Sequence, residues 1–127
     1  MAYPSGSGSE ILRRGVISPQ ANSATSFKFD GTSPSPGTAT DVVPALHIIT
    51  MISIIICEKS SSIQNFTLYA NDGSTQCNLI EAQVLQSKET FVFSDKFCLI
   101  GGDWLKINGD SGSNFQILYT YVDQDWS

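Results

Sequence analysis

The most apolar run of this chain is Pro44-Ala45-Leu46-His47-Ile48-Ile49-Thr50-Met51-Ile52-Ser53-Ile54-Ile55-Ile56-Cys57-Glu58. Seven of its fifteen positions are Ile or Leu, and six of these are Ile. The run begins at a proline and ends where Glu58-Lys59-Ser60 returns the chain to polar residues. It is too short to span a bilayer as a helix, which takes about 20 apolar residues.

The side chains of this run favour a strand over a helix. A β-branched residue such as Ile loses side-chain freedom in a helix but packs well on a pleated sheet. An unbroken apolar run, in which apolar and polar residues do not alternate, is typical of a strand that is covered on both faces. The sequence therefore predicts the central strand of an all-β domain over 44–58.

Shorter strand-like segments lie on both sides of this run. From Ala24 to Asp30 apolar and polar residues alternate, which places Phe27 and Phe29 on one face of a strand. The pair Asp72-Gly73 is the strongest hairpin signal in the chain. The other expected strands cover 10–17, 63–70, 76–85, 90–100, 104–107 and 115–122, with 90–100 forming one strand or two.

These segments make up one domain of about eight short strands, with turns at roughly 10-residue spacing and no helix. We predict a single-domain antiparallel β-sandwich over 9–127, with either a jelly-roll or an immunoglobulin-like strand order. We expect residues 1–8 to form a flexible N-terminal arm, because nothing in them can be buried in a core. Residues 123–127 are expected to form a tail after the last strand.

The composition favours a binding or structural protein with neutral surfaces. Charged residues make up 15% of the 127 residues, against about 25% in an average domain. Burying such a surface against a partner removes little charge from water. The formal net charge of −5 argues against phosphate or nucleic-acid binding as the main activity.

The three cysteines, Cys57, Cys77 and Cys98, have no spacing typical of a metal site. Each lies in an apolar, strand-like segment, where a free cysteine acts as a small apolar side chain. We therefore expect reduced thiols in the core, no cofactor and no metal. The first residues lack the apolar core of a signal peptide, and this agrees with synthesis in a cytoplasm.

Catalytic residues are not evident in the sequence. The single histidine, His47, lies between apolar residues, and no nucleophile elbow of the form GxSxG is present. We expect His47 to lie at the rim of the core with a satisfied ring nitrogen. The aspartates, including Asp30 and Asp72, are mostly in turns, where such side chains cap their own backbone. Calcium binding by these loops is a weaker alternative. We expect that the chain is not an enzyme.

Aromatic and basic residues near the chain ends are candidates for partner contact. Most aromatic residues alternate on strands and are expected to pack in the core, but Tyr3 and Trp126 lie in polar termini. They are explained if the ends pack on a neighbouring subunit. The predicted partner contacts are Tyr3, Pro4, Arg13, Arg14 and Trp126.

Several segments resemble small virion structural proteins of tailed bacteriophages, particularly marine and cyanobacterial ones. The matching segments are 1–10, 44–50, 90–97, 101–103 and 119–127. The likeness is a pattern of strands and turns over most of the chain. It implies a non-enzymatic β-domain that is made in the host cytoplasm and incorporated into the particle in many copies.

Three functions follow from this resemblance and from the composition. The first is a capsid decoration (cement) protein that binds the major capsid protein and stabilises the head shell, as a homo-oligomer for which symmetry suggests a trimer. The second is a component of the tail, baseplate or fibre. The third, from another class, is a carbohydrate-binding β-sandwich that stacks sugars on Trp104 or on exposed tyrosines. Neither nucleic acid nor a membrane is expected as a partner.

Overall fold

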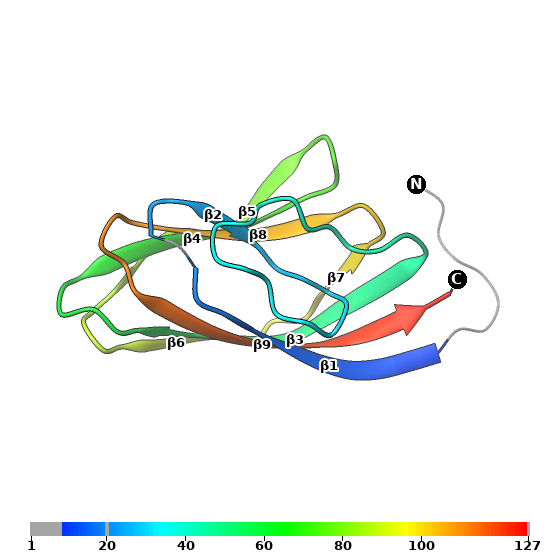
Figure 1. Ribbon diagram of the computed structural model, residues 1–127, viewed down its shortest axis with the longest axis horizontal. Coiled ribbons are helices and arrows are strands. Elements are labelled where there is room, and N and C mark those ends of the chain that lie inside the picture. The colour runs from blue at the N-terminus through cyan, green and yellow to red at the C-terminus, as the bar shows by residue number, and fades with distance from the viewer. Residues whose placement is uncertain (1–8, 20, 127) are drawn as a thin grey trace.

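The structure is a computed structural model, which describes residues 9–19 and 21–126. These residues form a β-sandwich of two antiparallel sheets (Figure 1). The prediction of an all-β sandwich is therefore confirmed. Within the described ranges no helix is long and apolar enough to cross a membrane. The strands are β1 (Ser9–Ile17), β2 (Ala24–Ser26), β3 (His47–Glu58), β4 (Gln64–Asn71), β5 (Gln76–Leu85), β6 (Thr90–Phe93), β7 (Phe97–Ile100), β8 (Trp104–Gly109) and β9 (Phe115–Asp125).

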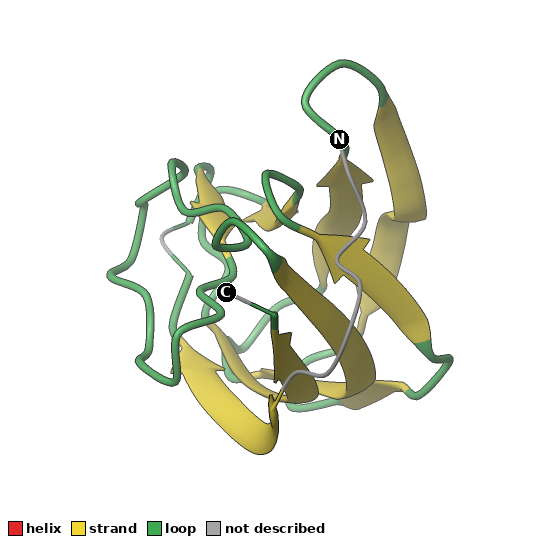
Figure 2. Cartoon of the chain, turned by 90° about the vertical axis from the view of Figure 1, so that its right-hand side faces the viewer, coloured by secondary structure: helices red, strands yellow, loops and turns green. Residues whose placement is uncertain are grey.

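The strand order is that of a jelly roll. One sheet has the order β1-β9-β3-β6, with β7 also paired to β3, and the other has the order β2-β8-β4-β5. If β6 and β7 count as one interrupted strand, the first strand pairs with the last and the second with the second-to-last. The third then pairs with the interrupted strand, and the fourth with the fifth. This nested pairing across two sheets identifies the jelly roll among the two strand orders expected. Figure 2 shows the strands and loops along the long axis of the sandwich.

The apolar run forms the central part of its sheet as β3, between β9 and the β6/β7 pair. Its inward side chains Ile49, Ile54 and Ile56 are fully buried against the other sheet. Coverage on both faces, which the sequence predicted, is not found within the described residues. Ile48 and Ile55 on the other face are only partly buried, because no second layer covers that side. A bulge between Met51 and Ser53 shifts the register with β9.

Three boundaries differ from the expectation. Residues 44–46 form a turn before β3 rather than the start of the strand, and the His47 N–H bonds the carbonyl of Pro44. Strand β2 ends at Ser26, whereas the sequence predicted a strand over 24–30. The segment 90–100 forms two strands, β6 and β7, with a break at 94–96, which is one of the two forms expected. Of the expected tail 123–127, residues 123–125 continue β9. Asp123 is buried there among charged partners described below.

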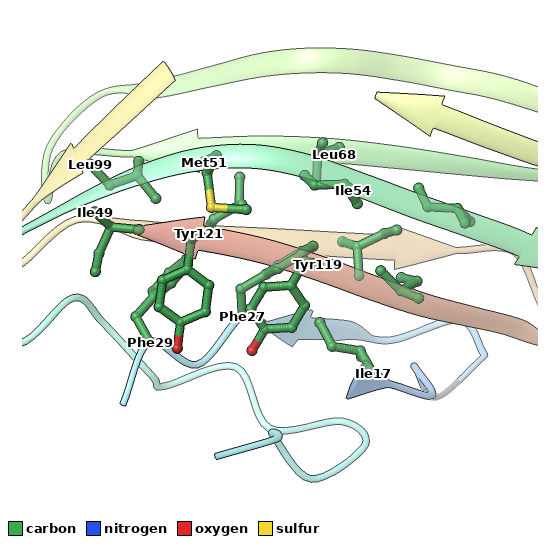
Figure 3. Close-up of a cluster of buried hydrophobic side chains, with 14 of the residues drawn as sticks. Ile17, Phe27, Phe29, Ile49, Met51, Ile54, Leu68, Leu99, Tyr119 and Tyr121 are labelled. Carbon is green, nitrogen blue, oxygen red and sulfur yellow. The ribbon is translucent and has the colours of Figure 1, made fainter. Parts of the chain in front are cut away.

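The core lies between the two sheets and is rich in aromatic rings. Figure 3 shows Tyr119 and Tyr121 of β9 beside Phe27 and Phe29 of the segment after β2. The two tyrosine rings stack with centroids 5.7 Å apart, and Phe27 meets Tyr119 edge-on at 4.8 Å. Such aromatic pairs contribute about 0.5–1.5 kcal/mol each beyond the area that they bury. The predicted placement of Phe27 and Phe29 on one buried face is confirmed.

Both buried tyrosine hydroxyls are held by backbone groups. The Tyr119 hydroxyl donates to the carbonyl of Lys28 at 2.6 Å and accepts from the Lys28 N–H at 3.2 Å. The Tyr121 hydroxyl accepts from the N–H of Gly31 at 3.0 Å. Burial raises the pKa of both hydroxyls above the ordinary value of 10.0, although these hydrogen bonds from backbone N–H groups oppose the shift.

The raised pKa values predict a loss of stability at alkaline pH. A raised pKa means that the folded state holds the proton while the unfolded state releases it, so stability is complete below pH ~10 and declines above it. Above pH ~10, the free energy of unfolding should fall by about 1.4 kcal/mol per pH unit for each tyrosine that stays protonated in the folded state. Urea unfolding at several pH values measures it. Tyr119→Phe, which has no hydroxyl at this position, should show a shallower decline, and equal slopes would contradict this assignment.

Candidate functional site

The outer face of the β1-β9-β3-β6/β7 sheet carries exposed apolar side chains. A row of four apolar side chains, of which Ile55 is half-buried, crosses β1, β9, β3 and β6. Val16 is opposite Leu118, Leu118 is opposite Ile55, and Ile55 is opposite Val92. Val92 is 56% exposed, Val16 44% and Leu118 39%. A second row joins Leu12 of β1, which is 68% exposed, to Val122 of β9. We call Leu12, Val16, Ile55, Val92, Leu118 and Val122 the apolar face.

Polar residues on this outer face are mostly uncharged. The row between the two apolar rows holds Arg14, Thr120 and Ser53. Charged side chains on the strands of this face gather at the β1 edge, where Glu10 and Arg14 flank Leu12. Association through this face would therefore remove little charge from water.

The opposite sheet has a different outer face. Its outward positions on β4 and β8 are Asn65, Thr67, Tyr69, Asn71, Trp104, Lys106 and Asn108. This is the polar surface that an antiparallel sheet usually presents to water. The contrast between the two outer faces singles out the apolar face as the surface suited to contact with another protein.

Arg13 lies on the inner side of β1 and is part of a charged cluster at one end of the sandwich. Its Nε donates to Oδ2 of Asp123 at 3.2 Å. The other oxygen of Asp123 lies 2.7 Å from Nδ1 of His47, and Nε2 of His47 lies 3.4 Å from Asp125. Asp123 is 2% exposed, and its two carboxyl oxygens face the guanidinium of Arg13 and the imidazole of His47. Arg13 is thus engaged within the chain.

The geometry around His47 does not provide a general base. Both ring nitrogens face carboxylates, whereas a base that activates a nucleophile needs one nitrogen directed at that nucleophile. The predicted position of His47 at the rim of the core with a satisfied nitrogen is confirmed. Within the described ranges, no three His, Cys, Asp or Glu side chains are grouped as metal ligands.

The charged cluster predicts a clear difference between two neighbouring aspartates. Asp123→Asn should lower the free energy of unfolding by about 1–3 kcal/mol, since hydrogen bonds to charged groups contribute at this level. Asp125→Asn, whose side chain is 40% exposed, should cost about 1 kcal/mol or less. Urea unfolding of both variants near neutral pH measures the difference. Equal costs would mean that burial of Asp123 has no energetic role.

Two of the other predicted contact residues lie in the described part of the chain. Arg14 is exposed on the outer face of β1. Trp126 is partly buried next to Leu46, and its backbone N–H donates to the Leu46 carbonyl at 3.0 Å. Its indole Nε1 is buried and has no hydrogen-bond partner among the described residues. Tyr3 and Pro4 lie outside the described residues, as does the expected arm 1–8.

The cysteines are not core thiols as expected. Cys77 and Cys98 are exposed and Cys57 is half-buried. Cys77 and Cys98 line the same open cleft of about 280 Å³. This volume is just below the range of about 300–1,000 Å³ that is usual for small-molecule sites. The prediction failed because β5 and β7 lie at sheet edges, where an apolar pattern does not ensure burial.

The turn aspartates behave largely as predicted. Asp72 accepts hydrogen bonds from the N–H groups of Thr75 and Ser74, and these bonds hold the pKa of its carboxyl below the ordinary value. Asp30 accepts the N–H of Thr32 in the same way. These carboxylates cap their own turns.

Trp104 is less open to a sugar ring than expected. It is partly buried, and the ammonium group of Lys106 lies 3.1 Å from its ring centroid. This cation–π contact occupies one face of the indole. A sugar could stack only on the other face.

The apolar face was not predicted as a site from the sequence, although a signal for it exists. In β3 and β9 both the odd and the even positions are apolar at Ile54-Ile55-Ile56 and at Ile117-Leu118. A strand with one face in water should alternate, so these positions indicate that the second face also needs a cover. The prediction from the sequence was that other parts of the same chain cover this second face.

Comparisons with known proteins do not show a family for this chain. No family model and no curated protein matches this chain. Among solved structures, the chain is similar to the Eiger TNF from S. frugiperda, with a TM-score of 0.37 and 12% identity over 98% of this chain and 89% of that chain. A likeness of this degree carries no argument, and the fold assignment rests on the strand order given above.

Proposed function

We propose that this chain is a non-enzymatic structural protein of a bacteriophage virion, and specifically a capsid decoration protein that binds the head shell through the apolar face. The observation that carries the proposal is the row Val16-Leu118-Ile55-Val92, which crosses β1, β9, β3 and β6 on the outer side of one sheet. The resemblance to small phage virion proteins supplies the identity of the partner, which is the major capsid protein.

The outer side of the sheet that carries the apolar face is large enough for a specific contact. Four strands about 4.8 Å apart, each contributing about nine residues of 3.3 Å, cover about 570 Å². Burying this area on both partners removes about 1,100 Å² from water, which is above the lower bound of about 1,000 Å² for a specific interface. Between the apolar rows, the neutral side chains of Thr120 and Ser53 can form hydrogen bonds with the partner, and the charged residue of that row, Arg14, lies at the β1 edge.

Binding of this kind would stabilise a shell without any chemical step. A protein that binds the assembled shell and not its free subunits lowers the free energy of the assembled state, in the same way as any ligand that is selective for one state. Many copies would resist the outward pressure of packaged DNA together. This role implies synthesis in the host cytoplasm and incorporation into the virion.

A single charge on the apolar face tests the proposal. Leu118→Asp should weaken binding to purified shells that lack this chain by about tenfold or more, because the carboxylate must lose its water. Asn108→Asp adds the same charge at an exposed position on the opposite sheet and should bind like the wild type. Co-sedimentation with the shells measures both. Equal binding by the two variants would exclude the apolar face.

The copy number in purified particles distinguishes the head from the tail. Quantitative mass spectrometry should find hundreds of copies for a decoration protein, against about six to twelve for a tail or baseplate component that follows the tail symmetry. A glycan array tests the carbohydrate-binding alternative. Specific binding that is lost in Trp104→Ala would replace the present proposal.

A further inference from the structure

Strand β1 has a free edge. It is the end strand of its sheet, with β9 on one side, and none of the described strands pairs with its other side. Residues 9–12 are exposed, and the strand contains no proline. Natural proteins usually protect such an edge, because its unpaired N–H and C=O groups can pair with another strand.

The direction of the backbone groups on this edge follows from one hydrogen bond. The Val16 N–H bonds Oγ of Ser33, outside the sheet, at 3.1 Å and so points away from β9. Because N–H groups along a strand alternate between its two sides, the N–H groups of Glu10, Leu12 and Arg14 also point away from β9. Ser33 satisfies the donor at Val16, so the edge that is open among the described residues ends at Arg14.

We propose that two copies of this chain pair antiparallel along β1, with Leu12 opposite Leu12 on a twofold axis. In this register Glu10 of each copy lies opposite Arg14 of the other. The three opposite pairs formed by residues 10, 12 and 14 are the ones whose backbone groups point outward, so each pair exchanges two N–H···O bonds. The two charge pairs are on the same face of the joined sheet as the Leu12 side chains.

Other registers of the same edge are less favourable. A twofold axis at Glu10 or at Arg14 places two like charges opposite each other, which is destabilising in a sheet. An axis at Arg13 places Glu10 opposite Val16, whose N–H is already bonded to Ser33. An axis at Ile11 places Glu10 opposite Leu12 and forms no charge pair among the described residues. The order Glu10, Leu12, Arg14 therefore favours the register with Leu12 on the axis, in which the two charges lie at equal distances from an apolar centre.

The pairing joins two sheets into one, with the strand order β3-β9-β1 continuing into the β1-β9-β3 of the second copy. Because the axis is perpendicular to the sheet, both apolar faces lie on the same side and form one surface of double width. This inference concerns the oligomer and is independent of the proposed function. It also replaces the trimer that symmetry alone suggested.

Charge exchange tests the register. Sedimentation equilibrium of the full chain over a concentration series should give the mass of a dimer. Glu10→Arg and Arg14→Glu each place like charges opposite each other twice and should raise the dissociation constant of the dimer about tenfold. The double variant E10R/R14E should return to the wild-type value. An equimolar mixture of the two single variants should form mixed dimers as tightly as the wild type.

Other outcomes overturn the proposal. A monomer at all concentrations, a trimer, or a double variant as weak as the single variants would each exclude this pairing. Leu12→Pro removes a donor that points away from β9 and should also give monomers, with circular dichroism confirming that the sandwich is intact. Leu118→Asp on the apolar face should leave the dimer unchanged, so failure of the pairing and failure of the proposed function remain distinguishable.

Discussion

Gly15→Val is expected to destabilise the sandwich by about 3 kcal/mol, at the upper end of the range for overpacked cores. Gly15 of β1 lies opposite Tyr119 of β9. A Cβ atom at position 15 would lie closer than 3.0 Å to both Cζ and the hydroxyl oxygen of Tyr119. Real Cβ contacts are never this short, so the tyrosine ring or strand β1 would have to move.

The ring of Tyr119 has little freedom to move. Its hydroxyl is bonded to both backbone groups of Lys28, its face stacks on Tyr121, and the edge of Phe27 contacts it. Displacing the ring would break two hydrogen bonds of a buried group and leave the backbone of Lys28 without these partners. A side chain at position 15 is therefore expected to lower the free energy of unfolding, because the neighbouring groups cannot move aside to make room for it.

A double-mutant cycle separates this clash from the loss of glycine itself. In a Tyr119→Leu background the shorter side chain leaves room, so Gly15→Val should lose most of its cost and the coupling energy should be about 1–3 kcal/mol. Tyr119→Phe keeps the ring and should keep the clash. Urea unfolding of the variants measures the coupling. Additive free energies in the Leu background would contradict the close approach.

Much of the fold could be predicted from the sequence, because apolar alternation and turn residues act locally. The pair Asp72-Gly73 does connect two adjacent strands, β4 and β5, and Phe27 and Phe29 do share one buried face. Strand order was not predictable in the same way. It depends on pairings such as β1 with β9, whose paired residues are 100 or more positions apart, and local patterns do not encode such pairings.

The charged end of β9 is a second feature that could not be predicted from the sequence. Asp123 and Asp125 look like tail residues in the sequence, since carboxylates are rarely buried. Asp123 is nevertheless buried, because Arg13 and His47 come to it from two other strands. A single sequence does not show which cation will compensate which carboxylate. For the same reason, the contact of Arg13 with Asp123 was not predicted from the sequence.

Ile54→Ala is expected to cost about 2–5 kcal/mol of unfolding free energy, whereas Ile55→Ala should cost about 1 kcal/mol or less in the isolated chain. The two residues are identical and adjacent in one apolar run. Ile54 is fully buried between the sheets, and its truncation leaves a cavity in a close-packed core. Ile55 faces outward between Leu118 and Val92, where water can fill the space.

The same pair of variants should reverse its ranking when binding is measured. Ile55→Ala removes a central side chain of the apolar face, so its affinity for shells should fall although its stability is nearly unchanged. Ile54→Ala keeps the apolar face and should bind with wild-type affinity at temperatures where it remains folded. Urea unfolding and co-sedimentation with shells provide the two measurements. If Ile55→Ala proved as costly to stability as Ile54→Ala, the second face of β3 would be covered within the chain, and the reason for proposing a partner on that face would disappear.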